Sequence, residues 1–216
     1  MKRTALIAGS TGLVGQSCLQ ALLENPNYER VIALVRKPTA EKHSKLKQVI
    51  CDFENLATLA TCLQAQDIFC CLGTTIKVAG TRENFYKVDF TYVFELARLM
   101  KEQGAEQFIV VSAMGASKNS RVFYSQVKGE METAIKDLGY RTVHILRPSL
   151  LLGDRREVRM GEKIAEKVTK ILNPLFVAGL KKYKPIEADK VGRFMVELGA
   201  QNLVGTYVYE SDQIQI

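Results

Sequence analysis

One tyrosine and one lysine stand four positions apart in the segment Tyr124-Ser125-Gln126-Val127-Lys128. If this segment is helical, the phenol and the ammonium lie one turn apart on the same face. A nearby cation lowers the pKa of a phenol from its usual ~10, which would let the tyrosine exchange a proton near neutral pH. The pair therefore suits hydride transfer to a carbonyl, and the lysine could also hold a nicotinamide ribose.

The same chemistry needs a hydroxyl that hydrogen-bonds the substrate oxygen. Ser112 follows the apolar run Phe108–Val111, and the segment with the tyrosine and lysine comes shortly after it. Open α/β sheets bind ligands at the carboxyl ends of their strands, which is where this serine would lie. Chance alone would produce a Tyr-x-x-x-Lys spacing in a chain of this size, so the position of the pair carries the prediction.

A glycine-rich segment follows the first apolar run, Thr4–Ala8, and precedes an apolar helical pattern. Gly9 would permit the tight turn, Gly12 would let the backbone approach a pyrophosphate, and Gly15 would let the helix pack closely on the strand. The amides of residues 11–14 would point at the phosphates, helped by the helix dipole. The expected cofactor loop is Gly9, Ser10, Thr11, Gly12, Leu13, Val14 and Gly15.

The end of the second apolar run indicates which dinucleotide binds. An NAD site would place an acidic residue about 20 residues beyond the loop, to bind the ribose hydroxyls. Arg36 and Lys37 stand there instead, with no acidic residue before Glu41. Two cations suit a 2′-phosphate, and Arg36 could also stack on adenine. We therefore expect NADP rather than NAD, although two solvated basic residues would give the same pattern.

Apolar runs alternate with helical patterns along the chain, as in a parallel sheet covered by helices on both faces. We predict an α/β fold: a single Rossmann-type, doubly wound domain with a core over about residues 1–150 and a small C-terminal lid over about 151–216. Expected strands are Thr4–Ala8, Val31–Val35, Gln48–Cys51, Ile68–Cys71, Phe108–Val111, Val143–Leu146 and Tyr207–Tyr209. Expected helices are Leu13–Glu24, Phe85–Gln103, Phe123–Leu138, Glu162–Leu172 and Ala188–Leu198.

The composition, 47% hydrophobic over 216 residues, is that of a globular protein. No apolar run reaches the ~18 residues that cross a membrane, and residues 4–8 are too short for a signal-peptide core. We therefore expect a cytoplasmic protein that does not enter the membrane. The five cysteines lack metal-ligand spacing, so we expect reduced, mostly buried thiols and no metal site.

The net charge of +7 is concentrated late in the chain, in residues 151–186. This basic segment could attract an anionic substrate or an acidic protein partner, or it could simply be a solvated surface. It lacks the interleaved aromatic residues of a nucleic-acid site, so no nucleic-acid partner is expected. His144 lies in an apolar run and is interpreted as a core residue, and Asp189 as an acid at the start of a helix.

Several segments together resemble the extended or atypical branch of the short-chain dehydrogenase/reductases. Within it they are most similar to the NADPH-binding group of the Tat-interacting protein and its bacterial relatives. The resemblance covers residues 4 to about 156. The segments that carry it are Cys70-Cys71-Leu72-Gly73-Thr74-Thr75, Val88-Asp89, Val111-Ser112-Ala113-Met114-Gly115-Ala116, residues 124–130 and Arg147-Pro148-Ser149-Leu150-Leu151.

The resemblance implies a role for each matching residue. Ser112, Tyr124 and Lys128 would be catalytic, Asp52 and Phe53 would border the adenine, and Cys71, Leu72, Gly73 and Thr74 would line the ribose and phosphates. Pro148, Ser149 and Leu150 would contact the nicotinamide end. Many extended-branch enzymes carry their serine where this chain has Met114, so Ser112, Ser117 or neither serves the site.

Two functions follow. The first is an NADP-dependent oxidoreductase acting on a small carbonyl or hydroxyl substrate, because residues beyond Gly153 are too few for a nucleotide-sugar domain. The alternative is a regulatory or scaffold protein that binds NADP(H) without turnover and uses the basic segment as its partner surface. A homodimer through the helices at 85–103 and 123–138 is expected by analogy with relatives.

Overall fold

The computed structural model describes residues 2–153 and 183–214. Seven parallel strands form the main sheet in the order β3-β2-β1-β4-β5-β6-β9. The strand order reverses between β1 and β4, the point at which doubly wound sheets bind nucleotides. The fold class expected from the sequence is therefore confirmed. The strands are β1 (Arg3–Ala8), β2 (Tyr28–Val35), β3 (Leu46–Ile50), β4 (Asp67–Cys70), β5 (Gln107–Val111), β6 (Thr142–Arg147) and β9 (Gly205–Glu210).

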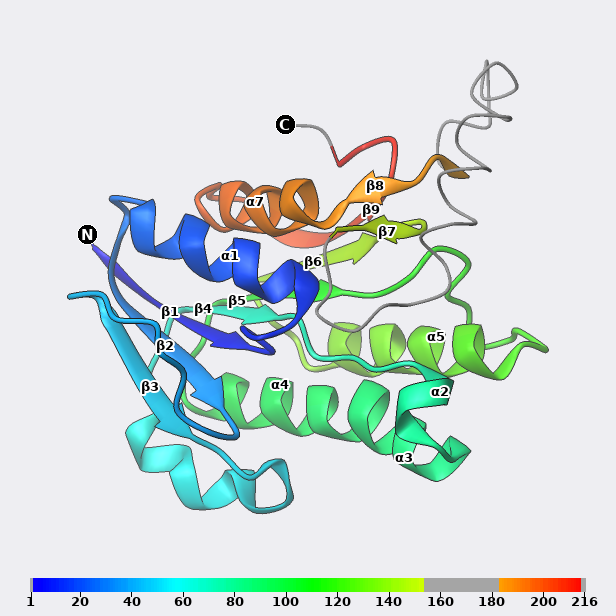
Figure 1. Ribbon diagram of the computed structural model, residues 1–216, viewed down its shortest axis with the longest axis horizontal. Helices are drawn as coiled ribbons and strands as arrows, with labels where there is room; N and C mark the ends of the chain where they lie inside the picture. Colours follow the sequence, from blue (N-terminus) through cyan, green and yellow to red (C-terminus); the bar gives the residue numbers. More distant parts are fainter. Residues whose placement is uncertain (1, 154–182, 215–216) are drawn as a thin grey trace.

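Helices cover both faces of the sheet (Figure 1). On one face lie α1 (Leu13–Glu24) and α7 (Ala188–Gly199), and on the other lie α4 (Tyr92–Glu102) and α5 (Phe123–Asp137). Because both faces are covered, the central strands are apolar without alternation, as in residues 5–8 of β1, which are all fully buried. The core consists of two apolar clusters, one on each side of the sheet.

The helix expected over 85–103 lies between β4 and β5, but it begins at Arg82, contains a π turn and follows a further short helix. The chain here forms α2 (Ile76–Ala79), α3 (Arg82–Tyr86), a π-helical turn η2 (Lys87–Thr91) and then α4. Thr75 and Thr81 cap α2 and α3, each accepting a hydrogen bond from a backbone amide three residues on. The π turn widens the backbone where it carries the buried Asp89. A 3-10 helix, η1 (Phe53–Cys62), was also not expected.

Much of the C-terminal region expected to form a lid belongs to the main fold. Helix α7 packs against α1 so closely that a Cβ on Gly192 would lie 2.7 Å from the Val14 carbonyl oxygen. Strand β9 adds the seventh strand beside β6. The short parallel strands β7 (Leu151–Leu152) and β8 (Ile186–Glu187) form a separate two-stranded sheet. The helix expected at 162–172 lies outside the described residues.

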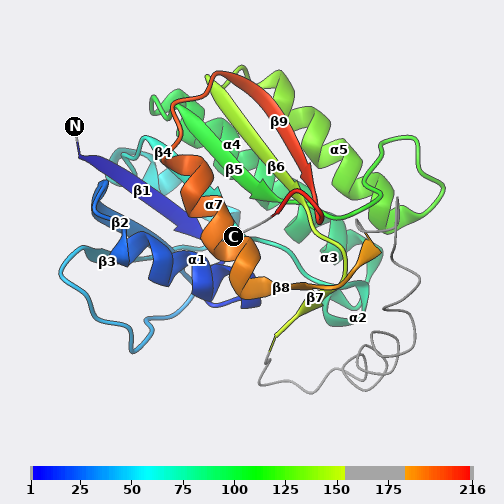
Figure 2. The same ribbon diagram turned by 90° about the horizontal axis from the view of Figure 1, so that it is seen from above.

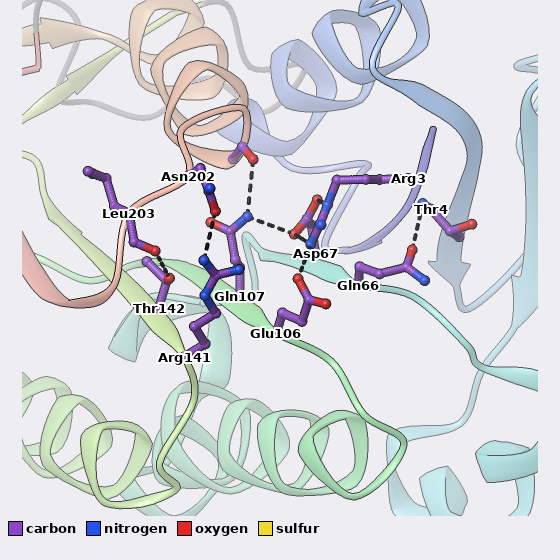
Figure 3. Close-up of polar contacts among 11 residues, drawn as sticks. Arg3, Thr4, Gln66, Asp67, Glu106, Gln107, Arg141, Thr142, Asn202 and Leu203 are labelled. Atoms are coloured by element: carbon purple, nitrogen blue, oxygen red, sulfur yellow. Dashed lines mark hydrogen bonds and ion pairs between the residues drawn. The ribbon is translucent and has the colours of Figure 1, made fainter. Parts of the chain in front are cut away.

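A polar cluster ties the strands together at the amino end of the sheet (Figure 3). Asp67, fully buried at the start of β4, accepts two hydrogen bonds of 2.7 Å from Arg3 and one of 2.9 Å from Gln107. Gln107 also donates to the Gly199 carbonyl at the end of α7. This network joins three strands and a helix at the end remote from the β-strand carboxyl termini, and it leaves the opposite end for a ligand.

Within the described residues, no helix is both long and apolar enough to span a bilayer.

Candidate functional site

A cavity of about 490 Å³ lies at the carboxyl end of the sheet. Its walls come from the segments that follow β1, β4, β5 and β6, so it occupies the switch-point crevice of the fold. Figures 1 and 2 show α2 and β7 at this end of the molecule. The lining residues are Gly12, Leu13, Val14, Cys71, Leu72, Gly73, Thr74, Thr75, Val78, Asp89, Val111, Ser112, Tyr124, Lys128, Ser149, Leu150, Leu151, Leu152 and Gly153.

The glycine loop has the geometry that its spacing predicts. Gly9 takes a φ of +84°, and a Cβ there would lie 2.6 Å from the Cys71 carbonyl oxygen. A Cβ on Gly15 would lie only 2.0 Å from the Gly9 carbonyl oxygen, so the first turn of α1 touches the loop beneath it. Gly12 is different, because its nearest neighbour would be 3.3 Å away and it faces the cavity.

The start of α1 is well suited to an anion. Gly12 is its N-cap, no side chain caps the helix, and the first turn holds no acidic residue. The backbone amides of the first turn and the positive end of the helix dipole therefore remain available for a phosphate. These features fit the pyrophosphate of a dinucleotide.

Tyr124 and Lys128 both line the cavity, from the first turns of α5. Tyr124 is half-buried and packs against Phe85, with ring centroids 5.4 Å apart. Lys128 is 3% exposed, and its Nζ lies 2.7 Å from Oδ1 of the buried Asp89. Asp89 also accepts a 2.8 Å hydrogen bond from the Thr74 amide through Oδ2. One carboxylate thus joins the lysine to the loop after β4.

Burial changes the electrostatics expected for Tyr124. Burial raises the pKa of Tyr124, Lys128 lowers it and Asp89 raises it, so the pKa lies above its ordinary value instead of below it. Lys128 lowers the pKa as expected, but the effect of burial is larger, and Asp89 adds to it. Burial alone would lower the pKa of Lys128, yet Asp89 and Tyr124 outweigh this and raise it, so the lysine stays charged.

Ser112 lines the cavity, but its hydroxyl is bound from behind. Its Oγ donates a 2.5 Å hydrogen bond to Oε1 of Glu132, a residue of α5 that is 2% exposed. Arg147 at the end of β6 binds both oxygens of the same carboxylate, at 3.0 and 2.6 Å. Glu132 accepts all three of these hydrogen bonds, so the single proton of Ser112 points to its carboxylate. Asp89, Glu132 and Arg147 were not predicted as site residues.

The loop that carries the alternative serine crosses α5 at Gly129. A Cβ on Gly129 would lie 2.2 Å from the backbone of residues 117 and 118, so glycine allows this close crossing. Ser117 is exposed, and its amide donates to the Ser125 carbonyl at 3.0 Å. Ser117 does not line the cavity, whereas Ser112 does.

Several predicted binding residues lie outside this lining. Arg36 and Lys37 are exposed after β2. Asp52 caps η1, and Phe53 stacks on Tyr92 with ring centroids 5.4 Å apart. Pro148 is buried and its carbonyl accepts from the Met114 amide, while Gly9, Ser10, Thr11 and Gly15 form the turn behind Gly12. Of the predicted set, the structure brings together Gly12, Leu13, Val14, Cys71, Leu72, Gly73, Thr74, Ser112, Tyr124, Lys128, Ser149 and Leu150 around the cavity.

Sequence reasoning also missed the apolar part of the lining. Val78, Val111, Leu151, Leu152 and Gly153 were not predicted as site residues. Val78 lies on α2, which was expected to be loop, and no residue pattern marks it. Only the position of Val111 at a strand end could have indicated its place.

The other singled-out residues do not meet the cavity, with one exception. His144 is fully buried on β6, and its Nδ1 lies 3.1 Å from the Tyr209 hydroxyl. Cys18, Cys51 and Cys70 are buried free thiols, and Cys71, the exception, is partly exposed at the cavity. Most of the basic segment expected over 151–186 lies outside the described residues.

Several known proteins are similar to this chain in sequence. Protein HTATIP2 of Rattus norvegicus is 36% identical over 169 residues, covering 76% of this chain and 69% of that protein. Protein fmp52, mitochondrial, of Aspergillus fumigatus is 34% identical over 223 residues, covering 100% of this chain and 94% of that protein. Candida albicans has a similar protein, also named mitochondrial. These names contradict the expected cytoplasmic location, which rested on the lack of a recognisable targeting segment.

Solved structures share the fold at low sequence identity. MoeE5 in complex with UDP-glucose and NAD superposes with a TM-score of 0.71 at 16% identity, over 95% of this chain and 74% of that one. A dTDP-4-dehydrorhamnose reductase from Bacillus anthracis in complex with NADP gives a TM-score of 0.66, at 16% identity over 97% of this chain and 75% of that one. A family model described as NAD(P)H-binding matches residues 9–198. The chain therefore belongs to this NAD(P)H-binding family.

Proposed function

We propose that the protein is an NADP(H)-dependent oxidoreductase of the short-chain dehydrogenase/reductase type that reduces a small carbonyl compound. The observation that carries the proposal is that the glycine loop and the Tyr124–Lys128 pair line one cavity at the switch point of the sheet. A loop that receives a pyrophosphate and a phenol that can transfer a proton are the two parts this reaction needs.

The chain's own residues divide the work of holding the cofactor. The first-turn amides of α1 would bind the pyrophosphate, and Cys71 to Thr74 would border the ribose. Arg36 and Lys37, exposed at the carboxyl end of β2, would bind a 2′-phosphate. Asp52 and Phe53 would border the adenine, and Pro148 to Leu150 the nicotinamide end. The bound nicotinamide would supply the hydride.

Tyr124 would supply the proton. A phenol whose pKa lies above its ordinary value is neutral at physiological pH and acts as a proton donor. During reduction the carbonyl carbon takes the hydride, its oxygen takes the phenolic proton, and the phenolate that remains faces the Lys128 ammonium. The raised pKa therefore favours reduction of a carbonyl over oxidation of an alcohol at neutral pH.

Ser112 would orient the substrate oxygen as a hydrogen-bond acceptor. Because its proton points to Glu132, its hydroxyl oxygen can receive a hydrogen bond but has no second proton to donate. This suits the alcohol product better than the carbonyl substrate, and leaves Tyr124 as the donor to the carbonyl oxygen.

A second function has specific support. A lysine paired with Asp89, a tyrosine with a raised pKa and a serine hydroxyl bonded to Glu132 would also suit a protein that binds NADP(H) without turnover. In that case the basic segment at 151–186 would be the surface for a protein partner. A homodimer through α4 and α5 also stays a prediction.

Titration with NADPH and NADH, followed by nicotinamide fluorescence, tests the cofactor. We expect NADPH to bind more tightly, and Arg36→Ala to weaken NADPH at least tenfold while NADH changes little, because a charge-assisted contact is lost. Arg141→Ala removes an exposed cation at the amino end of the sheet and should change neither affinity. No binding of either nucleotide would refute the proposal.

Turnover tests the chemistry. Tyr124→Phe should abolish carbonyl reduction and leave the NADPH affinity within twofold of wild type. If NADPH binds tightly and no carbonyl compound is reduced, the second function is correct.

A further inference from the structure

Exposed apolar side chains stand at the mouth of the cavity. Val78 on α2 is 60% exposed and Leu150 after β6 is 52% exposed, and both line the cavity. Ile76, on the same short helix as Val78, is 44% exposed. Leu151 and Leu152 continue the lining from β7. Apolar side chains that remain exposed beside a cleft are typical of a surface that a ligand covers.

The described part of the same lining carries no net charge. Among the described residues that line the cavity, only Asp89 and Lys128 are charged, and they neutralise each other at 2.7 Å. Both are almost completely buried, so neither can turn to meet a distant group. The α1 amides in the lining would be occupied by the cofactor pyrophosphate, and the rest of the described lining offers a substrate phosphate or carboxylate no unpaired cation. Such a group would lose its hydration with little compensation.

Several polar groups of the lining are hydrogen-bonded within the protein. Ser112 donates to Glu132, and the Thr74 amide donates to Asp89. The Thr75 hydroxyl accepts from the Val78 amide, and the Ser149 hydroxyl donates to the Lys184 carbonyl. These groups therefore have less hydrogen-bonding capacity left for the hydroxyls of a sugar. Tyr124 is the polar side chain positioned to serve a single reacting oxygen.

We propose that the substrate is an uncharged, apolar aldehyde or ketone whose hydrocarbon part lies on Val78, Leu150 and the β7 leucines. This inference rests on the proposed function for its reacting group, and on the lining alone for its apolar part. It separates this chain from the structural neighbours whose bound ligands are nucleotide sugars, despite the shared fold.

Two aldehydes of equal length test the inference with purified protein and saturating NADPH. Hexanal is apolar throughout, and 6-oxohexanoate ends in a carboxylate. We expect kcat/KM for hexanal to be at least tenfold higher than for 6-oxohexanoate. Equal values, or a preference for the anion, would overturn the inference while turnover itself upheld the proposed function.

A charge placed at the cavity mouth should change this preference. Val78→Lys should raise kcat/KM for 6-oxohexanoate relative to hexanal at least fivefold, and 0.5 M salt should reduce the gain. Val204→Lys is the matched control, because Val204 is 64% exposed just before β9, at the amino end of the sheet. An unchanged ratio in Val78→Lys, or the same change in Val204→Lys, would contradict the placement.

Binding without turnover separates the two proposals. Hexanamide and adipamate (the carboxylate-bearing amide of similar length) are not reduced, and calorimetry on the NADPH-loaded protein measures their binding. Tighter binding of hexanamide, with neither aldehyde reduced, would uphold the apolar site and refute the oxidoreductase proposal. Binding of neither amide, or tighter binding of adipamate, would refute the apolar site.

Discussion

His144 makes the stability of the protein depend on pH in a predictable way. The imidazole is fully buried between Tyr207 and Tyr209 of β9, with ring centroids 5.6 and 5.8 Å away. Its Nδ1 meets the Tyr209 hydroxyl, but its buried Nε2 has no hydrogen-bond partner in the described structure. A proton on the ring would place a charge where nothing described compensates it. Burial accordingly lowers the pKa of His144 from 6.5 to about 4.

The sign and size of the effect follow from linkage. The folded protein resists a proton that the unfolded chain accepts, so the stability is full above pH 6.5 and falls as the pH decreases toward 4. A difference of this size corresponds to about 3 kcal/mol below pH 4, at 1.36 kcal/mol for each pH unit. Between pH 7.5 and 5, the loss from this residue is about 2 kcal/mol.

Urea unfolding at several pH values measures this loss. We expect His144→Phe, which keeps an aromatic ring between the two tyrosines, to lose about 2 kcal/mol less than wild type between pH 7.5 and 5. His43, the other histidine, is exposed, so His43→Phe should follow wild type. If His144→Phe shows the wild-type pH dependence while folding normally, the burial argument for this residue is wrong.

Two further sets of substitutions test the site by folding and binding. Gly15→Ala should destabilise the fold by at least about 2 kcal/mol, because the Cβ would lie 2.0 Å from the Gly9 carbonyl oxygen. Gly12→Ala should destabilise it by under about 1 kcal/mol, yet weaken NADPH binding at least tenfold. Equal losses of stability for the two variants in urea unfolding would contradict this prediction. Lys128→Met leaves the Asp89 carboxylate buried without its cation and should lower the stability of the fold by about 3 kcal/mol. Adding Asp89→Asn should recover most of this loss. If thermal unfolding shows that the two losses add, the two residues are not coupled.

The sequence predicts those parts of the site that depend on local geometry. Gly9 and Gly15 could be assigned because a turn with positive φ and a close helix contact leave a direct mark on residue type. The order of strands and helices could also be predicted, because the central strands are covered on both faces and therefore read as apolar runs. The helix expected over 85–103 is present, but its start at Arg82 and its π turn were not predicted, because a π turn changes the register without interrupting the apolar pattern.

Residues that act through a partner on another element could not be found in this way. In the sequence, Glu132 looks like any polar residue of α5, and its role depends on contacts with Arg147 and Ser112 that form only in the folded protein. The expected boundary between core and lid near residue 150 was misplaced for the same reason, because it depends on contacts between distant parts of the chain. Helix α7 and β9 complete the main fold through contacts with α1 and β6, which are distant in the sequence.

The electrostatics of Tyr124 show why the spacing of two residues does not determine their chemistry. A lysine one turn away lowers the pKa of a phenol, but burial of the phenol opposes this effect. Asp89, from a different helix, also forms an ion pair with the same lysine. The aspartate raises the pKa of the buried Lys128, whereas burial, with a smaller contribution from Asp89, holds the pKa of Tyr124 above its ordinary value. The ion pair leaves the described cavity lining without net charge. Burial thus favours a neutral phenol that donates a proton, and the Asp89–Lys128 pair favours a substrate that carries no charge of its own.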